Sequence, residues 1–316
     1  MVAVTLFFNP FQLHNSCRSL MEIVFLNRST CNKIRVIFIL YHLEVRKVSV
    51  LRAIRKCYQF FVDKPIKKGI ILKNRYEIVH VIGTGSYGIV YLCRDLHTNE
   101  NKVVKQLRPS KRRKEVEMFE HEISILRMLN HKNIPVLFEA FLTNGSLFYV
   151  MSFIEGDNLE DQIFLIENTF NENEALLILS HLLELVDYLH KKDIYHQDLR
   201  IPNMLLKNKE LYLIDFGLSK HMVVPFRSSP NNLDDILEMK LQDYYDLGEI
   251  LLYLLYTTYS SKNKKALPWT EELSLEKETV YLLKRLLQLK EPYLTTAEIS
   301  IDLQAALKAT KKKINQ

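Results

Sequence analysis

The chain has 316 residues, of which 47% are hydrophobic and 25% charged, the composition of an ordinary soluble globular protein. Its longest uncharged apolar run near the start, residues 36–43, is much shorter than the roughly 20 residues that a membrane-spanning helix needs. The first 13 residues lack a basic region and a cleavage site of small residues, which argues against a secretory signal. The four cysteines lie too far apart for a C-x-x-C metal or redox pair, so we expect reduced thiols and a cytoplasmic location.

Residues 1–66 are expected to form a basic N-terminal extension. The first 75 residues hold 14 Lys and Arg against 3 Asp and Glu, whereas the rest of the chain carries a net charge of −5. Residues 48–62 place apolar side chains at helical spacing with basic ones between them, which is typical of a basic amphipathic helix. Such a helix can pack on the neighbouring lobe, or it can make a peripheral contact with an anionic membrane. A wrongly assigned start codon, with translation beginning near residue 48, is a third interpretation.

A glycine-rich hairpin follows the extension. Gly83, Gly85 and Gly88 lie within six residues, although the whole chain contains only eight glycines. Apolar, β-branched residues predict strands on both sides, at 76–82 and 89–92. Because the glycine motif of a dinucleotide-binding fold leads from a strand into a helix, the hairpin argues against that fold. The motif alone is compatible with an ordinary β-turn or with close approach of the backbone to a ligand.

The remaining pattern predicts a small sheet followed by a helical region. Alternation of apolar and polar residues predicts strands at 101–107, 135–142 and 146–153. Apolar residues at helical spacing predict one helix between them, at 114–130. Helices are expected later at 175–190, 241–256, 276–289 and 296–309, with a short strand pair at 204–207 and 211–215. Asn171-x-x-Glu174 predicts a capping box before the first of these helices. We therefore divide the rest of the chain into residues 67–151, residues 152–310 and a basic tail at 311–316.

Three oxygen-bearing side chains stand at short intervals in the second region. Asp198 is followed five residues later by Asn203, and twelve residues after that by Asp215 in the sequence Asp-Phe-Gly. Carboxylate and amide oxygens suit Mg²⁺, which keeps waters and phosphate oxygens as its other ligands. Each motif alone also fits a capping carboxylate or a turn. Their joint occurrence favours a site that binds a metal and phosphate.

With these residues in view, the chain resembles the eukaryotic-like (Hanks-type) protein kinase family, in its bacterial serine/threonine form, over residues 75–310. A glycine loop, a strand lysine, a helix glutamate, H-x-D-x-x-x-x-N and D-F-G occur here in the family's order. The resemblance implies an α+β fold of two lobes, a small antiparallel sheet with one helix and a larger, mainly α-helical lobe. It also implies transfer of the γ-phosphoryl group of ATP, with Mg²⁺ or alternatively Mn²⁺, to a protein hydroxyl of serine or threonine rather than tyrosine.

The resemblance also assigns roles to individual residues. It implies that Lys105 pairs with the phosphates, that Glu122 holds Lys105, and that Asp198 accepts or orients the proton of the attacking hydroxyl. Arg200 is expected to contact the γ-phosphate, and Asn203 and Asp215 to bind the metal ion. The implied ATP-binding residues are Ile82, Gly83, Gly85, Ser86, Gly88, Val90, Val103, Lys105, Met151, Phe153 and Leu205. The expected partner is a protein substrate, which includes this chain itself through autophosphorylation, and the catalytic region gives no strong signal for nucleic acid.

Two departures from the family pattern bear on regulation and specificity. Gln197 stands where the family commonly has the arginine that pairs with a phosphorylated activation segment. We therefore expect activity without that phosphorylation, so that replacing the serines of the segment (Ser219, Ser228 and Ser229) by alanine leaves turnover near wild type. Arg200 replaces the lysine usual in serine/threonine kinases, which weakens the assignment of the acceptor hydroxyl.

A third departure concerns the peptide-docking region. The segment between Asp215 and Asp243 is short and lacks A-P-E, and no arginine occurs around residues 291–295 to pair with the missing glutamate. A shortened docking platform keeps two rival hypotheses open, a phosphotransferase acting on small molecules and an ATP-binding pseudokinase scaffold. The fuller glycine loop favours a protein kinase over a phosphotransferase acting on small molecules. Retention of the charged and metal-binding residues argues against a pseudokinase scaffold.

Overall fold

The computed structural model describes residues 63–85, 88–110, 113–222, 230–260 and 267–314. Residues from Asp63 onward form one compact unit. The expected amphipathic helix at 48–62, and all but the last four residues of the expected extension 1–66, lie outside the described residues. Among the helices that are described, each is too short or too polar to span a lipid bilayer.

The first half of this unit is a six-stranded antiparallel sheet with the order β1-β2-β3-β4-β6-β5. The strands are β1 (Ile71–Leu72), β2 (Tyr76–Thr84), β3 (Gly88–Asp95), β4 (Asn101–Leu107), β5 (Leu137–Thr143) and β6 (Ser146–Ser152). Its inner face buries alternate aromatic and β-branched side chains, because successive residues of a strand point to opposite faces. At the β5–β6 turn, Asn144 and Gly145 both have positive φ, 49° and 73°, as a tight two-residue hairpin turn requires.

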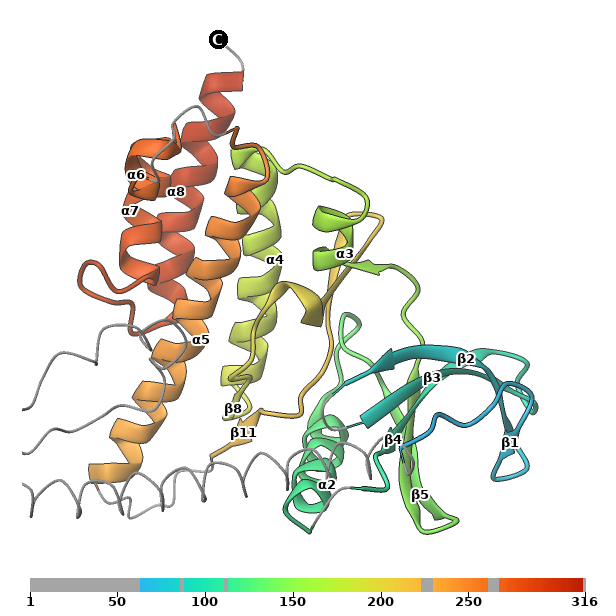
Figure 1. Cartoon of the computed structure of the whole chain (residues 1–316). Coiled ribbons are helices and arrows are strands. Elements are labelled where there is room, and N and C mark those ends of the chain that lie inside the picture. Colours follow the sequence, from blue (N-terminus) through green and yellow to red (C-terminus); the bar gives the residue numbers. More distant parts are fainter. Residues whose placement is uncertain (1–62, 86–87, 111–112, 223–229, 261–266, 315–316) are drawn as a thin grey trace, which may run out of the picture. The chain divides into compact units, whose positions relative to one another are not determined.

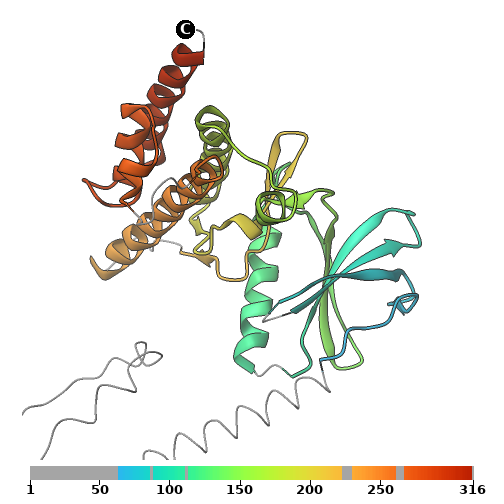
Figure 2. The ribbon, with the colours of Figure 1, turned by 45° about the horizontal axis from the view of Figure 1, so that its top comes forward.

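A single helix of the sheet region, α2 (Arg113–Met128), lies along one face of the curved sheet (Figure 2). Its apolar stripe, which includes Phe119, Ile123 and Leu126, is buried in the larger hydrophobic core. That core continues into the helical region, so α2 lies against β5 of the sheet and shares one buried cluster with residues of the helices. The helix therefore links the two parts of the unit.

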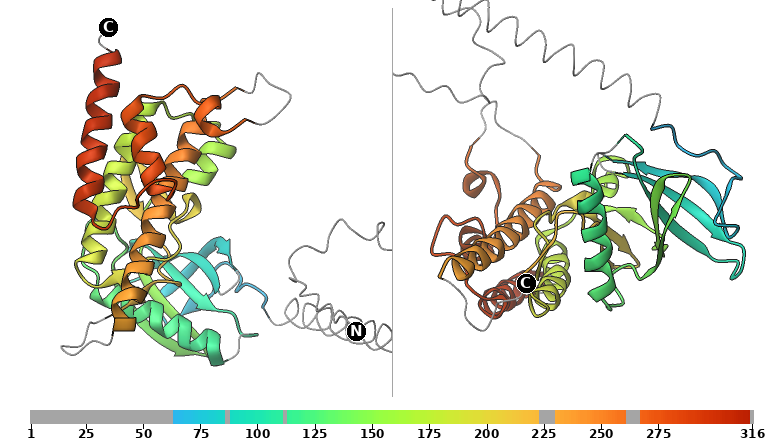
Figure 3. Two further views of the ribbon diagram at one scale, coloured as in Figure 1. Left: turned by 90° about the vertical axis from the view of Figure 1, so that its left-hand side faces the viewer. Right: turned by 90° about the horizontal axis from the view of Figure 1, so that it is seen from below.

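The second half is mainly helical (Figure 1). It contains α3 (Leu159–Phe164), α4 (Glu172–His190), α5 (Pro230–Tyr256), α6 (Trp269–Glu272), α7 (Lys277–Leu286) and α8 (Thr296–Ile314). Helices α4, α5, α7 and α8 pack against one another (Figure 3). Short elements lie beside them: β7 (Asp157–Asn158), β8 (Ile194–Tyr195), the 3-10 turn η1 (Ile201–Asn203), β9 (Met204–Lys207), β10 (Glu210–Leu213) and β11 (Lys220–His221). The predicted α+β fold of two lobes is confirmed.

The start of α4 follows its sequence signal. The side chain of Asn171 accepts a hydrogen bond from the backbone N–H of Glu174, and the Glu174 carboxylate accepts one from the Asn171 backbone, at 3.0 Å each. This is the predicted capping box.

Two helix boundaries differ from the sequence prediction. Helix α5 begins at Pro230, eleven residues before the predicted start, because Ile236 and Met239 continue its buried side by packing on Tyr195. Helix α8 runs to Ile314, so the predicted tail at 311–316 begins as helix. Basic residues are favourable near a helix C-terminus, where the helix dipole is negative.

An arginine does support the last helix, although not at residues 291–295. Arg285 of α7 forms ion pairs with Glu298 and Asp302 of α8, at 3.0 Å each, and its guanidinium lies 3.8 Å from the ring centroid of Tyr293. The sequence prediction considered only the stretch immediately before α8 and therefore missed this pairing.

Candidate active site

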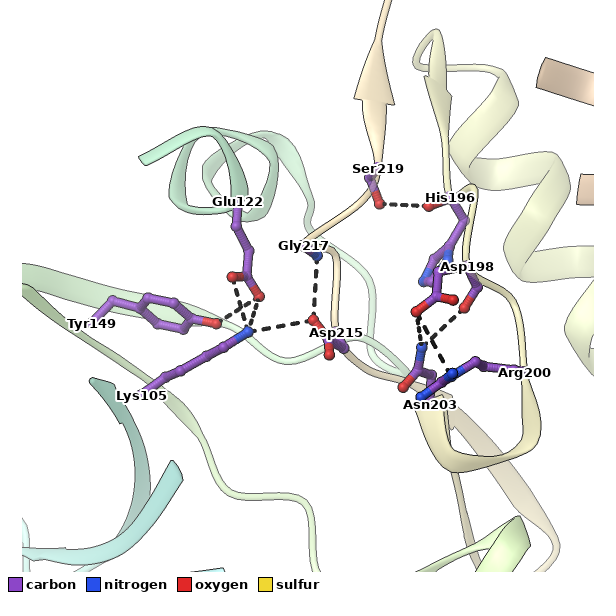
Figure 4. A network of polar contacts seen from close by, with 10 residues as sticks. All are labelled: Lys105, Glu122, Tyr149, His196, Asp198, Arg200, Asn203, Asp215, Gly217 and Ser219. Carbon is purple, nitrogen blue, oxygen red and sulfur yellow. Dashed lines mark hydrogen bonds and ion pairs between the residues drawn. The ribbon is translucent and has the colours of Figure 1, made fainter. Parts of the chain in front are cut away.

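A buried ion pair joins the sheet to α2. In β4, Lys105 lies between Val90 of β3 and Tyr149 of β6 in the strand register. Its Nζ lies 2.6 Å from Oε1 and 2.9 Å from Oε2 of Glu122 in α2 (Figure 4). The ion pair expected between the two residues is therefore present. Glu122 faces Lys105 because the apolar stripe of α2 fixes the rotation of the helix on the sheet.

Burial and charge act in opposite directions on this pair. Burial by itself would lower the pKa of Lys105, but the negative charges of Glu122 and Asp215 outweigh it, so the pKa of Lys105 is raised. Burial also raises the pKa of Glu122, against the opposing effect of Lys105. The carboxylate keeps its charge in the interior because the lysine ammonium is in direct contact with it.

Asp215 reaches the same lysine from the helical region. Its Oδ1 lies 3.3 Å from Nζ of Lys105 and accepts a hydrogen bond of 3.3 Å from the backbone N–H of Gly217. Burial would raise the pKa of Asp215, but the charge of Lys105 and the hydrogen bond from Gly217 lower it overall. Asp215 also has a positive φ of 64°, a conformation that is uncommon outside glycine and is often found at functional sites.

Asp198 and Asn203 are joined by hydrogen bonds. Nδ2 of Asn203 donates to the backbone oxygen of Asp198 at 2.9 Å and to its Oδ2 at 3.0 Å. The turn η1 between them brings the side chains together over five residues. Arg200 is mostly exposed, and its Nε lies 3.8 Å from Oδ2 of Asp198. A carboxylate held in this way is oriented but still reaches solvent.

Helix α5 holds the loop that carries Asp198. The buried carboxylate of Asp243 accepts hydrogen bonds from the backbone N–H groups of His196, at 3.0 Å, and Gln197, at 2.8 Å. The side chain of Gln197 donates to the backbone oxygen of Met239, also in α5. His196 is fully buried and packs on Phe216 with ring centroids 5.1 Å apart, and burial lowers the pKa of its imidazole. A neutral imidazole suits this apolar contact.

Several of the charged side chains described above line one cavity of about 450 Å³. Its walls include predicted site residues from both regions: Gly85, Gly88, Val90, Lys105, Glu122, Met151, Asp198, Arg200 and Asp215. The other predicted site residues that are described do not line this cavity: Ile82, Gly83, Val103, Phe153, Leu205 and the predicted metal ligand Asn203. Val103 lies directly beside Met151 in the strand register, and Leu205 pairs with Asn158 of β7. Ser86 lies outside the described residues.

Steric crowding explains why one position of the glycine loop, Gly88, is a glycine. A Cβ at Gly88 would lie 2.9 Å from the backbone oxygen of Gln106 and 3.3 Å from Cγ of Lys105, so a side chain there would displace the strand that carries the lysine. A Cβ at Gly83 or Gly85 would lie 3.7 Å or 3.9 Å, respectively, from its nearest neighbouring atom. These are ordinary van der Waals distances, so a Cβ would fit at Gly83 and Gly85 and packing within the chain does not require glycine there.

The residues fit a nucleotide with a divalent cation. A cavity with a lysine ammonium and a glycine loop suits a polyphosphate. The Asp215 carboxylate in its wall, and the Asn203 amide bonded to Asp198 of the same wall, are oxygen-bearing groups of the kind that suits Mg²⁺. In such sites Mg²⁺ commonly uses one or two protein oxygens and takes phosphate oxygens and waters as its other ligands. Asn203 and Asp215 would hold the ion, and Lys105 would bind the phosphates.

Two site residues were missed in the sequence. Arg108, at the end of β4, donates from Nε to the backbone oxygen of Gly85 in the glycine loop at 2.8 Å. Its Nη1 lies 3.6 Å from the buried carboxylate of Asp63, the first residue that the structure describes. Tyr149 donates to Glu122 at 2.8 Å. Strand alternation could have found Tyr149, because it faces the same side of β6 as the predicted site residue Met151.

Comparison with known proteins gives a consistent result. Residues 76–229 match the family described as protein kinase domain. The chain is 42% identical over 259 residues to the probable serine/threonine-protein kinase YbdM of Bacillus subtilis (strain 168), covering 81% of this chain and 99% of that protein. It is 33% identical over 171 residues to the serine/threonine-protein kinase DCLK3 of Mus musculus, covering 51% of this chain and 21% of that protein. Calcium-dependent protein kinase 4 of Plasmodium falciparum (isolate 3D7) is 35% identical over 159 residues, with coverages of 48% and 30%.

Arg108 provides a test of how the glycine loop is held. Replacing it with methionine removes the hydrogen bond to Gly85 while keeping an unbranched side chain. A hydrogen bond from a charged donor at a partly exposed position contributes about 1 kcal/mol, so we expect the KM for ATP to rise about fivefold. Steady-state kinetics at varied ATP concentration measure this. Arg94→Met is the matched control, because Arg94 donates to Asn99 at an exposed position of the same sheet. Equal KM values for the two variants would contradict the role of Arg108.

Proposed function

The chain belongs to the protein kinase family, and from that premise we propose that it transfers the γ-phosphoryl group of Mg-ATP to a serine or threonine hydroxyl of a protein. The predicted membership in the bacterial serine/threonine branch of the family is confirmed. One observation carries the proposal most strongly. Lys105, Asp198 and Asp215 line a single cavity although they lie far apart in the sequence, and Asn203 is hydrogen bonded to Asp198.

The side chains of this cavity divide the work of the reaction. Lys105, held by Glu122, supplies a fixed positive charge for the phosphates. Asp198, held by Asn203, accepts the proton of the substrate hydroxyl. The oxygen of that hydroxyl bonds to the γ-phosphorus while the bond from the γ-phosphorus to the β–γ bridging oxygen breaks, which releases ADP. Asn203 and Asp215 hold the divalent cation, Mg²⁺ or Mn²⁺, which when bound neutralises phosphate charge. Most of the rate then comes from positioning and charge neutralisation.

We also propose that the enzyme needs no phosphorylation of its activation segment. Gln197 has no positive charge for a phosphate, and its side chain is bonded to α5. The segment after Asp215 is held by other contacts: β11 pairs with β8, and Nε2 of His121 in α2 is 2.9 Å from the backbone oxygen of Ser219. Ser219 is 2% exposed and its hydroxyl donates to the backbone oxygen of His196, which makes it a structural group rather than a phosphorylation site.

The location and the role of the extension are part of the same proposal. We place the enzyme in the cytoplasm, with peripheral membrane contact through residues 1–62, whose excess of Lys and Arg favours anionic lipid headgroups. Autophosphorylation is included, because the extension offers serines beside basic residues. Both points rest on the sequence.

One assay separates the proposed function from its rivals. Purified protein is incubated with labelled ATP and Mg²⁺, alone, with a generic basic protein and with small-molecule acceptors. We expect label on protein, and a loss of about 100-fold or more in Asp198→Ala, since a positioned general base contributes about that much. Asp235→Ala is the control, because Asp235 is an exposed residue of α5. Label on a small acceptor alone would indicate a small-molecule phosphotransferase. Nucleotide binding without any transfer would indicate a pseudokinase.

The independence from phosphorylation has its own test. Ser228 and Ser229 lie outside the described residues, and together with the buried Ser219 they are the serines of the segment. Replacing Ser228 and Ser229 by alanine should leave kcat near wild type, because Gln197 offers no charge partner to a phosphate. Initial rates of both proteins after phosphatase treatment measure this. A large loss of kcat in the double variant, or in the phosphatase-treated wild type, would refute it.

A further inference from the structure

We infer that Tyr149 is a positioning residue, whose hydroxyl holds the Glu122 carboxylate against Lys105 and thereby fixes α2 on the sheet. The inference rests on the proposed kinase function and adds a residue to its machinery. Tyr149 does not touch the reacting atoms. It acts through Glu122 and Lys105.

The hydroxyl of Tyr149 bonds to the carboxylate of the ion pair (Figure 4). The Tyr149 hydroxyl donates to Oε1 of Glu122 at 2.8 Å, and the same oxygen lies 2.6 Å from Nζ of Lys105. Tyr149 also lies directly across from Lys105 in the register of β4 and β6, and Nζ is 5.8 Å from the centroid of its ring. A single side chain of β6 therefore contacts both members of the ion pair.

The chemistry of the site gives the hydroxyl a definite role. Tyr149 is 1% exposed and Glu122 is 3% exposed, so water does not replace a missing hydrogen bond to the carboxylate. Burial raises the pKa of the Tyr149 hydroxyl well above its ordinary value, with a further contribution from the charge of Glu122. The hydroxyl thus remains protonated and acts as a donor to Glu122. The carboxylate is then held from two directions, by β4 through Lys105 and by β6 through Tyr149.

The same tyrosine also packs on α2 through its ring. Its centroid lies 5.1 Å from that of Phe119, one turn before Glu122. This contact offers a simpler explanation, in which Tyr149 is a core residue and its hydroxyl bonds to the nearest acceptor. The two explanations differ only in what the hydroxyl does, and Tyr149→Phe removes the hydroxyl while keeping the ring.

The sheet contains a matched control. Tyr76 of β2 is also 1% exposed, and its hydroxyl also donates to a glutamate, Oε1 of Glu139, at 2.6 Å. Glu139 lies on β5 and is paired with Lys73, and neither Tyr76 nor Glu139 lines the nucleotide cavity. Tyr76→Phe therefore makes the same chemical change in the same lobe at a site without a role in the reaction.

The experiment compares wild type, Tyr149→Phe and Tyr76→Phe as full-length proteins. Because a hydrogen bond to a charged group corresponds to about a tenfold change in an equilibrium or rate, we expect kcat of Tyr149→Phe to fall about tenfold, with a KM for ATP close to wild type. Hydrogen–deuterium exchange without nucleotide should be faster across residues 113–128 in Tyr149→Phe and unchanged there in Tyr76→Phe. Melting temperatures should fall by similar amounts in the two variants.

The outcomes separate the inference from the proposed function. An inactive wild type would refute the proposed function, and the exchange data alone would then decide whether Tyr149 fixes α2. An active wild type with equal kcat and equal exchange of α2 in both variants would overturn the inference and leave the function intact. A Tyr149→Phe protein that does not fold, beside a folded Tyr76→Phe, would also overturn it, because the hydroxyl would then support the lobe as a whole.

Discussion

The buried ion pair of Lys105 and Glu122 is the contact on which the site depends. It connects a central strand to α2, and Asp215 extends it to the helical region. Removing two charges from water costs free energy that their attraction offsets only in part, so such a pair is weak evidence for stability. A pair of apolar side chains could fill the same space. The function of the pair is therefore a better explanation for its presence, because a phosphate ligand needs a cation that is already fixed in place.

The second constraint is the way α5 holds the loop around Asp198. The Asp243 carboxylate accepts from the successive backbone N–H groups of His196 and Gln197, and Gln197, which directly precedes Asp198, has a positive φ of 64°. A conformation of this kind persists only when the surroundings determine it. The sheet thus fixes the charge for the phosphates, while the helical region fixes the base and the metal-binding side chains. Helix α2 connects the two parts, because it lies against β5, shares the larger hydrophobic core with the helices and contacts the backbone oxygen of Ser219 through His121.

Much of this arrangement could be predicted from local signals. The alternation of apolar residues predicted the strands, and the Asn171 capping box predicted the start of α4. These features depend on neighbouring residues, so their signals lie within a few positions. The motifs around Lys105, Asp198 and Asp215 indicated the site through a family resemblance rather than through local physics.

The features that escaped prediction depend on tertiary contacts. The early start of α5 reflects packing of Ile236 and Met239 on Tyr195, a residue of another element. In the sequence Arg108 is an ordinary residue just after a strand and Tyr149 an ordinary residue within one, and only the packing of the glycine loop and of α2 gives them partners. Arg285 supports α8 from the preceding helix, where a search near residues 291–295 does not reach.

The central claim, that these charged groups form one site for a metal-bound triphosphate, is tested most directly by calorimetric titration of ATP with and without Mg²⁺. The wild type should bind ATP more tightly when Mg²⁺ is present, and Asp215→Asn, which keeps the shape of the side chain but removes its charge, should lose that dependence. The same affinity with and without Mg²⁺ in the wild type, or an unchanged Mg²⁺ dependence in Asp215→Asn, would contradict the account.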